Sequence, residues 1–474
     1  MKKNFYLTTT LPYVNSDPHV GFALEIVQAD VIARYKRLIG DEVFFNTGTD
    51  EHGVKVYTKA VAEKKDPQTY TDEYALKFRN LKGTLNLSEV NFIRTTDKNH
   101  KEAAQEFWRR CSASGDIYKK NYKIKYCVGC ELEKTDSELV EGKCSIHPHL
   151  EIEIREEENY FFAFSKYGKK LLNLYKSNPD FLLPHYRLNE MKVFIEEKGL
   201  EDFSISRLKS KMPWGVEVPD DSEHIMYVWF DALVNYISAI GWPTDTETFN
   251  KWWPVTQFAG KDQVRQQAAM WQAMLMSVGI PSSKQIVIHG FINSGGQKMS
   301  KSLGNVIDPY EIVKEYGTDA LRYYLIREIH PFEDSDFTME KFKESYNANL
   351  ANGIGNLTSR IMKMAETYLE KPVEIKEKTI PDNFFNLLEV YEFNKAADFV
   401  WKEIGELDSI IQTKEPFKLV KTSKEEGIEI IKDLVVRLYT IARMLNPLLP
   451  ETSEKIKKCV SENKMPEAPM FLRK

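Results

Sequence analysis

The sequence predicts an α/β fold built on a parallel sheet, with a metal-bearing insertion and a helical region after it. Three observations indicate this. An apolar strand, an amphipathic helix and a second strand follow one another within residues 4–48, which is the repeating unit of a parallel sheet. Two close pairs of metal-ligand residues lie within 127–147. From about residue 345 onward the chain reads almost entirely as helix, with few glycines.

The first strand–helix–strand unit also indicates where ligands bind. Residues 4–8 (NFYLT) read as a buried strand, and residues 42–48 (EVFFNTG) read as the next one. Residues 19–38 between them read as a helix, because apolar residues recur three and four positions apart: Leu24, Val27, Val31, Tyr35 and Leu38. Parallel sheets bind ligands beyond the carboxyl ends of their strands, so segments 12–21 and 48–53 are expected to line a site.

Residues 116–225 depart from this pattern and are predicted to form an insertion. They hold the metal-type cluster, an acidic run and short mixed segments. The α/β pattern then resumes in four stretches: 224–237, 253–262, the helix-like 263–278 and the strand 285–292. We therefore expect residues 1–115 and 226–344 to be two halves of one α/β domain, and residues 345–474 to be a helical bundle.

Composition limits the class of protein. The chain has 474 residues, of which 42% are hydrophobic and 28% charged, as is typical of a soluble globular protein. Its net charge of -5 argues against a general nucleic-acid coat, which would be basic throughout. No apolar run long enough for a membrane span occurs, and the first residues do not read as a signal peptide. Unpaired cysteine beside a metal-type cluster indicates a reducing cytoplasm, and a monomer is the default expectation.

His19-Val20-Gly21 stands at the turn into the first predicted helix. Unpaired amides and the helix dipole attract phosphate to such a terminus. His19 could donate a hydrogen bond to a phosphate, and Gly21 would let a nucleotide approach the backbone. When the tripeptide is considered alone, an ordinary helix start with a capping histidine is the better explanation.

Lys298-Met299-Ser300-Lys301-Ser302 follows a strand and two glycines. Lys298 and Lys301 on such a loop could hold the charge that develops during phosphoryl chemistry. The alternative is a solvated basic loop. Because the HVG and KMSKS segments occur together, in this order and both on α/β flanks, coincidence is a poor explanation.

Cys127-x2-Cys130 and Cys144-x2-His147 form two close ligand pairs. Four sulfur and nitrogen ligands in this spacing fit tetrahedral Zn²⁺ with no open position for water, so the predicted role is structural. Free thiols are the alternative. His149 competes with His147, which we prefer because its spacing from Cys144 repeats that of the first pair.

The HVG and KMSKS segments together resemble the signature of class I aminoacyl-tRNA synthetases. The surrounding LPYVNSDPHVGF, FNTGTDEHG, YVWFDALVNY, FAGKD and IHGFINSGGQKMSKS are similar to methionyl-tRNA synthetases in particular, and the resemblance covers nearly the whole chain. It implies a Rossmann-like catalytic domain that activates methionine with ATP and Mg²⁺ and transfers it to tRNA(Met). It also implies that His19, Lys298 and Lys301 are catalytic and that Gly21 helps to bind ATP.

The resemblance implies an amino-acid pocket made of Leu11, Tyr13, Asp50, Arg207, Trp229, Ala232, Tyr236 and Gln267. Apolar and aromatic side chains suit a soft thioether, and Asp50 matches the carboxylate that holds the substrate ammonium. Plain core packing is the alternative for Trp229 and Tyr236. The chain departs from the family pattern at Gln267, where the family usually has histidine, and at Phe22, the last position of the first signature.

In the helical region, Asn356-Leu357-Thr358-Ser359-Arg360 resembles the family's anticodon-reading helix. Asn356 and Arg360 are thereby implied to read anticodon bases, and Phe417 to stack on one of them. The alternatives are a helix cap for Asn356, a solvated charge for Arg360 and a buried helix-start anchor for Phe417.

Two other functions stay open from the sequence. One is a class I synthetase for another small apolar amino acid. Against it, leucine, isoleucine and valine enzymes usually carry a large editing insertion, and the insertion here is short. The other is a tRNA-binding relative without catalysis, which should have lost His19, Lys298 and Lys301, yet all three are present.

Overall fold

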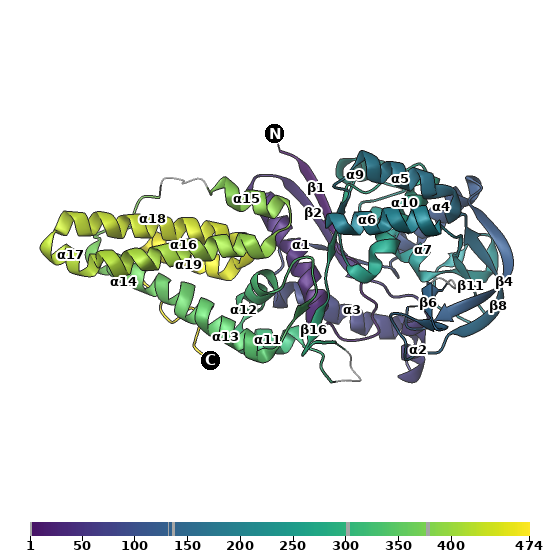
Figure 1. The fold of residues 1–474 in the computed structure, drawn as a ribbon, viewed down its shortest axis with the longest axis horizontal. Helices are drawn as coiled ribbons and strands as arrows, with labels where there is room; N and C mark the ends of the chain where they lie inside the picture. The colour runs from purple at the N-terminus through teal and green to yellow at the C-terminus, as the bar shows by residue number, and fades with distance from the viewer. Residues whose placement is uncertain (1, 131, 135–137, 300–303, 376–379) are drawn as a thin grey trace.

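The computed structural model describes the chain except residues 1, 131, 135–137, 300–303 and 376–379. The molecule is elongated (Figure 1). A helical bundle occupies one end, the parallel sheet with helix α1 lies in the middle, and the strands β4 and β8 lie at the other end. This arrangement confirms the predicted fold class of an α/β domain followed by a helical region.

A six-stranded sheet organises the middle of the molecule. Its strand order is β3-β2-β1-β14-β15-β9, and every neighbouring pair is parallel. The strands are β1 (Asn4–Thr8), β2 (Glu42–Thr49), β3 (Asn91–Arg94), β9 (Leu182–Leu183), β14 (Thr256–Gly260) and β15 (Gln285–His289). Because β1 lies between β2 and β14, the segments that follow these three strands meet at one edge of the sheet.

Helix α1 (Val20–Leu38) confirms the helix expected over residues 19–38, and its predicted apolar face is almost wholly buried. The other helices of the first half are α2 (Val54–Ala62), α3 (Pro67–Thr84) and α4 (Lys98–Ala113). Pro67 at the first helical turn and the side chain of Asp66 as N-cap explain where α3 begins.

The segment 116–225 is built mainly from antiparallel strands. These are β4 (Ile117–Cys127), β5 (Leu132–Glu133), β6 (Leu139–Val140), β7 (Lys143–Cys144), β8 (Glu153–Phe162), β10 (Phe203–Ser204), β11 (Ser206–Leu208), β12 (Glu217–Val218) and β13 (Asp221–Met226). Its helical elements are Phe164–Tyr167, α5 (Gly168–Ser177), α6 (His185–Val193) and Phe194–Lys198. This segment also supplies β9, which completes the parallel sheet as an edge strand.

The second half of the sheet domain returns to alternating helices and strands. The strand expected over residues 285–292 is divided into β15 and β16 by Gly290. A Cβ atom at Gly290 would lie 2.2 Å from the carbonyl carbon of Glu333, so the backbones cross too closely for any side chain. The remaining elements are α7 (Val228–Ala232), α8 (Asn235–Ser238), α9 (Thr246–Trp252), Lys261–Gln263, a π-helical turn (Gln266–Met270), α10 (Trp271–Ser277), β16 (Ile292–Ser294), β17 (Gln297–Lys298), α11 (Pro309–Tyr316), α12 (Thr318–Tyr323), Tyr324–Glu328 and β18 (Ser335–Asp336).

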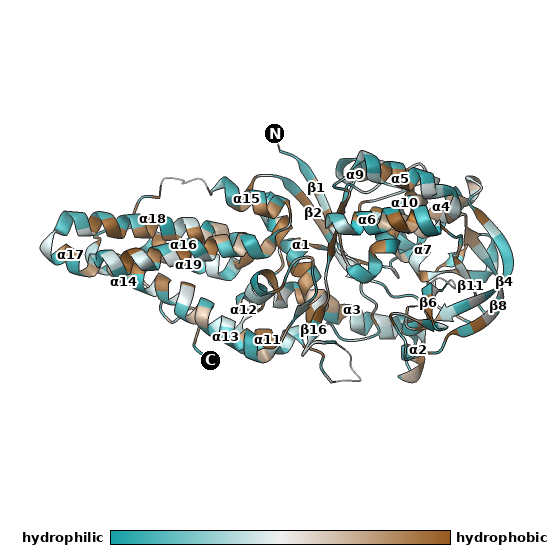
Figure 2. Cartoon of the chain, in the orientation of Figure 1, coloured by the Kyte–Doolittle hydropathy of each residue, from teal (hydrophilic) through white to brown (hydrophobic). Residues whose placement is uncertain are grey.

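Helices make up most of the described chain after Thr338. They are α13 (Met339–Ser345), a π-helical segment (Tyr346–Gly355), α14 (Asn356–Tyr368), α15 (Asp382–Glu389), α16 (Phe393–Lys414), α17 (Pro416–Thr422), α18 (Lys424–Leu448) and α19 (Pro450–Glu462). Hydrophobic and hydrophilic residues alternate along these helices (Figure 2), as expected of a bundle that buries one face of each helix. No helix in the described part of the chain is both long and apolar enough to cross a membrane.

Candidate active site and metal centre

A cavity of about 270 Å³ opens at the first turn of α1. Its lining includes His19, Gly21, Glu25, His289 and Lys298. The cavity therefore joins the start of α1 to the ends of β14 and β15, as the sheet topology predicts. Its position at a helix N-terminus suits a phosphate-bearing ligand.

His19 is the N-cap of α1, and its Nδ1 accepts a hydrogen bond of 3.1 Å from the backbone N–H of Gly21. A Cβ atom at position 21 would lie 2.9 Å from the His19 ring and 3.6 Å from the Met299 side chain. Gly21 thus keeps the space between the histidine and the segment before Ser300 open. Helix capping and ligand binding are compatible here, because the capping bond uses only Nδ1.

Glu25 and His289 form a buried pair in the same cavity that the sequence did not indicate. The Glu25 carboxylate accepts from the backbone N–H of Thr10 at 2.6 Å, from the Thr10 hydroxyl at 2.7 Å and from His289 Nε2 at 2.9 Å. His289 Nδ1 donates to the Gly290 carbonyl at 2.7 Å. Burial lowers the pKa of His289, but the hydrogen bond and charge of Glu25 outweigh it, so the pKa is raised overall.

Lys298 lies on β17 with its ammonium 4.9 Å from the centre of the Phe291 ring. It lines the cavity at α1 and also a second, adjoining cavity of about 440 Å³. Lys298, one of the two lysines predicted to be catalytic, therefore lines both cavities. Lys301, the other predicted lysine, lies outside the described residues.

The larger cavity collects several residues expected to bind the amino acid. Tyr13, Arg207 and Trp229 line it together with Gln266, and the rings of Tyr13 and Trp229 meet edge to face with centres 6.5 Å apart. The Arg207 guanidinium is buried, with Nη1 2.8 Å from Ser204 Oγ and 4.4 Å between its carbon and the Tyr227 ring centre. The side chains of one predicted site therefore meet although they come from three distant segments.

Tyr236 and Gln267 lie together in the core of the sheet domain. Gln267 Nε2 donates to the Tyr236 hydroxyl oxygen at 2.9 Å, and the Tyr6 hydroxyl donates to the Tyr236 carbonyl at 2.8 Å. Ala232 is buried at the end of α7, and Leu11 is half-buried in the segment after β1. The lining of the 440 Å³ cavity includes neither of these two residues, nor Tyr236 or Gln267.

Asp50 is paired with the segment after β1. Its backbone N–H donates to the Pro12 carbonyl at 2.9 Å, and its carbonyl accepts from the Val14 N–H at 3.2 Å. An isolated parallel bridge joins Tyr13 and Asp50. These backbone contacts hold the Asp50 main chain beside Tyr13, at the carboxyl-end edge where the sequence predicted a site.

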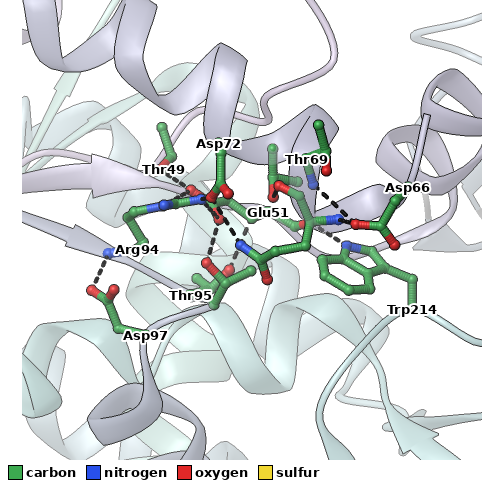
Figure 3. A network of polar contacts seen from close by, with 12 residues as sticks. Thr49, Glu51, Asp66, Thr69, Asp72, Arg94, Thr95, Asp97 and Trp214 are labelled. Carbon is green, nitrogen blue, oxygen red and sulfur yellow. Dashed lines mark hydrogen bonds and ion pairs between the residues drawn. The ribbon is translucent and has the colours of Figure 1, made fainter. Parts of the chain in front are cut away.

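Glu51, the next residue, anchors this loop through a network of polar contacts (Figure 3). Its buried carboxylate accepts from Arg94 Nε at 2.7 Å, from Arg94 Nη2 at 2.8 Å and from the Thr49 hydroxyl at 2.7 Å. Its carbonyl accepts from the Trp214 indole N–H at 2.6 Å. A buried carboxylate with this many donors is rigidly held, so the loop that carries Asp50 is fixed in place.

Asp231 lies between two buried histidines. Its carboxylate is 2.6 Å from His52 Nδ1 and 2.8 Å from His100 Nε2, and His100 Nδ1 is 3.0 Å from the Ser238 hydroxyl. Burial raises the pKa of Asp231, but the two histidines outweigh it and lower the pKa to about 2. Because Asp231 follows Trp229 on α7, this cluster ties the aromatic wall of the cavity to the loop that carries Asp50.

Cys127, Cys130, Cys144 and His147 form a group whose ligand atoms all lie within 4.8 Å of one another. Cys130 Sγ is 3.4 Å from Cys144 Sγ and 3.2 Å from His147 Nδ1. Sulfurs bonded to one tetrahedral Zn²⁺ would be about 3.7 Å apart, so these four side chains fit such an ion. His149 is not in this group.

The metal group borders the larger cavity. Cys130 and His147 line it beside Lys55, and Lys55 Nζ donates to the Gly129 carbonyl at 2.7 Å. A Cβ atom at position 129 would lie 2.4 Å from the His147 ring, so only glycine allows this turn and the histidine to coexist. The insertion thus supplies part of the wall of the larger cavity.

The residues predicted to read an anticodon lie in the helical region. Asn356 is the exposed first residue of α14, and Arg360 pairs with Asp408 of α16. Phe417 is 38% exposed on α17, whereas its neighbour Pro416 is buried. Pro416 therefore fills the role of buried helix-start anchor, and the Phe417 ring is accessible for stacking.

Comparison with known proteins gives one consistent family. The sequence profile described as "tRNA synthetases class I (M)" matches residues 5–151 and 129–362. A methionine–tRNA ligase of Thermotoga maritima is 43% identical over 98% of this chain and 76% of the relative. A methionine–tRNA ligase of Nostoc sp. is 40% identical over 96% of this chain and 89% of the relative.

Solved structures agree with the sequence relatives. Mycobacterium tuberculosis methionyl-tRNA synthetase in complex with methionyl-adenylate is 35% identical, with a TM-score of 0.92 over 99% of this chain and 100% of that chain. The apo form of the same protein is 32% identical, with a TM-score of 0.83 over 100% of this chain and 99% of that chain. This chain belongs to the class I methionyl-tRNA synthetase family.

Proposed function

We propose that this protein is a methionine–tRNA ligase. It joins methionine to ATP as methionyl-adenylate, releases pyrophosphate, and transfers the methionyl group to the 3′-terminal adenosine of tRNA(Met). The adjoining cavities support this proposal most directly. One suits a phosphate-bearing ligand at the start of α1, the other carries Tyr13, Trp229 and Arg207, and Lys298 lines both.

In the first step a methionine carboxylate oxygen attacks the α-phosphorus of ATP. The new bond to the carboxylate forms as the bond to the bridging oxygen of pyrophosphate breaks, and pyrophosphate leaves with that electron pair. His19 and Lys298, with Lys301, stabilise the charge that builds on the phosphate oxygens. Mg²⁺ bound with ATP would supply further positive charge on the phosphates.

The amino-acid site orients the nucleophile for this attack. Asp50 holds the methionine ammonium, and Leu11, Tyr13, Trp229, Ala232, Tyr236 and Gln267 surround the side chain. The fixed loop around Glu51 and the Asp231 cluster hold these groups in position, which reduces the entropy lost on reaching the transition state. Arg207 closes the cavity on the side of the insertion.

In the second step a ribose hydroxyl of the terminal adenosine attacks the methionyl carbonyl carbon. AMP leaves with the electron pair of the bond between the carbonyl carbon and the phosphate oxygen. The hydroxyl proton passes to the departing AMP. We propose that residues 345–474 bind the anticodon through Asn356, Arg360 and Phe417. Residues 1–115 and 226–344 form the catalytic domain, and 116–225 its insertion, in which Cys127, Cys130, Cys144 and His147 bind structural Zn²⁺.

Pyrophosphate exchange into ATP, measured separately with each of the twenty amino acids, tests this function. The expected result is exchange that depends on methionine, followed by methionyl transfer to tRNA(Met). If only another apolar amino acid supported exchange, the protein would be a class I synthetase with a different amino-acid specificity. Absence of exchange with every amino acid, in protein that still binds tRNA, would identify a binding protein without catalysis.

A further inference from the structure

The peptide group between Gly129 and Cys130 makes polar contacts on both of its sides. Its N–H belongs to Cys130 and donates to Cys127 Sγ at 3.4 Å. Its carbonyl belongs to Gly129 and accepts from Lys55 Nζ at 2.7 Å. Because a trans peptide is planar, its N–H and C=O point in opposite directions. This peptide group therefore lies between the sulfur of a predicted zinc ligand and an ammonium group.

The metal ligands themselves set the orientation of this peptide group. A Cβ atom at position 129 would lie 2.4 Å from the His147 ring, so the backbone at Gly129 packs against one ligand. Cys130 Sγ is 3.2 Å from His147 Nδ1. A tetrahedral ion holds its ligand atoms at fixed separations, and the turn between Cys127 and Cys130 then keeps one shape. The Gly129 carbonyl is thereby presented to Lys55 in one direction.

Lys55 comes from α2 and is half-buried beside the larger cavity. Its ammonium is 5.3 Å from the centre of the Tyr13 ring, and the Tyr13 ring meets Trp229 edge to face. All three residues line the cavity of about 440 Å³, together with Cys130. A single cation thus contacts a carbonyl beside the metal ligands and an aromatic ring of the proposed methionine site.

We propose that Lys55 is a positioning residue that couples zinc binding to methionine binding. This rests on the proposed function, in which the two ligand pairs hold Zn²⁺ and methionine lies against Tyr13 and Trp229. A cation at a carbonyl polarises the peptide group and makes its N–H a stronger donor. The Lys55 charge therefore strengthens the bond from the Cys130 N–H to the Cys127 sulfur, which is a negatively charged thiolate when it binds a metal.

Methionine acts on this contact by displacing water. Before substrate binds, water in the cavity screens the charge of Lys55. A methionine side chain against Tyr13 and Trp229 displaces part of that water, and Asp50 neutralises the substrate ammonium. The local dielectric constant falls, so the attraction between Lys55 and the Gly129 carbonyl increases. Methionine should therefore raise the affinity for zinc, and zinc should raise the affinity for methionine by the same factor.

Competition between the zinc-loaded protein and a chelator measures the zinc affinity with and without methionine. Saturating methionine should raise the zinc affinity of the parent about 5-fold, the lower end of the usual range for coupled sites. Lys55→Met keeps the length of the side chain but removes its charge and its donors, and should abolish this effect. Equilibrium dialysis gives the reciprocal measurement: zinc removal should weaken methionine binding about 5-fold in the parent and should not change it in Lys55→Met.

Matched controls make the result specific to Lys55. Lys59→Met removes an exposed lysine one turn further along α2 and should keep the parent coupling. Lys55→Arg keeps the positive charge and should retain coupling. Leucine has the same amino and carboxylate groups as methionine, so it controls for zinc binding by the free amino acid and should leave the zinc affinity unchanged. If Lys55→Met does not retain zinc, Lys55→Gln gives the same test, because a neutral amide polarises the carbonyl less than an ammonium does.

Two results would overturn the inference. One is a zinc affinity of the parent that methionine does not change. The other is an equal effect of methionine in Lys55→Met and in the parent, because the coupling would then run through the insertion as a whole and not through this lysine. A failure of the proposed function looks different, because the parent would then show no methionine-dependent pyrophosphate exchange, whatever its zinc affinity.

Discussion

The Arg322 guanidinium lies 2.8 Å from the Asp30 carboxylate, and both side chains are completely buried. Arg322 of α12 also donates to the carbonyls of Leu448, Pro447 and Leu85, at 2.9, 3.0 and 3.1 Å. One side chain thus connects α1, the end of α3 and the end of α18. The α/β domain and the helical region share this buried charge pair.

Removing one partner of this pair should destabilise the protein strongly. Arg322→Met leaves the Asp30 carboxylate buried with less compensation, and the expected loss in the free energy of unfolding is about 3–5 kcal/mol. Urea unfolding followed by circular dichroism measures it. Lys98→Ala breaks the exposed pair with Glu102 and should change stability by less than about 0.5 kcal/mol. Equal effects of the two substitutions would contradict this role.

Lys301→Ala should slow methionyl-adenylate formation by on the order of 10²–10³-fold, as for loss of a group that stabilises the transition state. Methionine affinity should change little, because the lysine acts on the phosphates. Single-turnover adenylate formation and equilibrium methionine binding separate these effects. Lys314→Ala, on the exposed surface of α11, is the matched control. An unchanged rate of adenylate formation in Lys301→Ala would refute the assignment.

The Glu25–His289 pair should make stability depend on pH. The pKa of His289 is raised in the folded protein, so its contribution is fully present below the unfolded value of about 6.5 and is lost as pH rises through the folded pKa. His289→Gln should therefore cost most stability at pH 6, and the difference from the parent should shrink towards pH 9. Urea unfolding across this range measures the difference. If the stability difference between the parent and His289→Gln increased with pH instead, the prediction would be wrong.

Purified protein should contain roughly one Zn²⁺ per chain, measured by mass spectrometry. Chelation should lower the melting temperature, because the metal replaces a hydrophobic core in the segments that carry the two ligand pairs. Cys144→Ser should abolish stoichiometric zinc. Cys459→Ser, in α19 of the bundle, should retain it. A melting curve indifferent to chelation would count against a structural site.

Features that depend on local periodicity were predictable from the sequence. The apolar spacing in 19–38 predicted α1, short apolar runs predicted β1 and β2, and the run 285–292 contains the whole of β15. The metal group was predictable because its four ligands lie within 21 residues and repeat one spacing. The two-residue strand β9 has no such pattern, and its pairing with β15 across about a hundred residues decides its place.

Partnerships across the sheet were not predictable in the same way. Glu25 and His289 are 264 positions apart, and Asp231 and His52 are 179 apart. Each residue alone reads as an ordinary helix, strand or loop position. The same holds for Gln267, where the sequence could show only the departure from histidine. Its hydrogen-bond partners Gln257 and Gln272 are connected to it by no motif.

Helix α1 runs from the cavity at its first turn to the helical region. His19 caps its first turn, and near its last turn the Tyr35 hydroxyl donates to Glu389 of α15 at 2.6 Å. Nineteen residues make a rod about 28 Å long. A tilt of about 5° around Tyr35 would move the His19 end, about 24 Å away, by roughly 2 Å. One continuous helix therefore joins the cavity at His19 to α15 of the helical region.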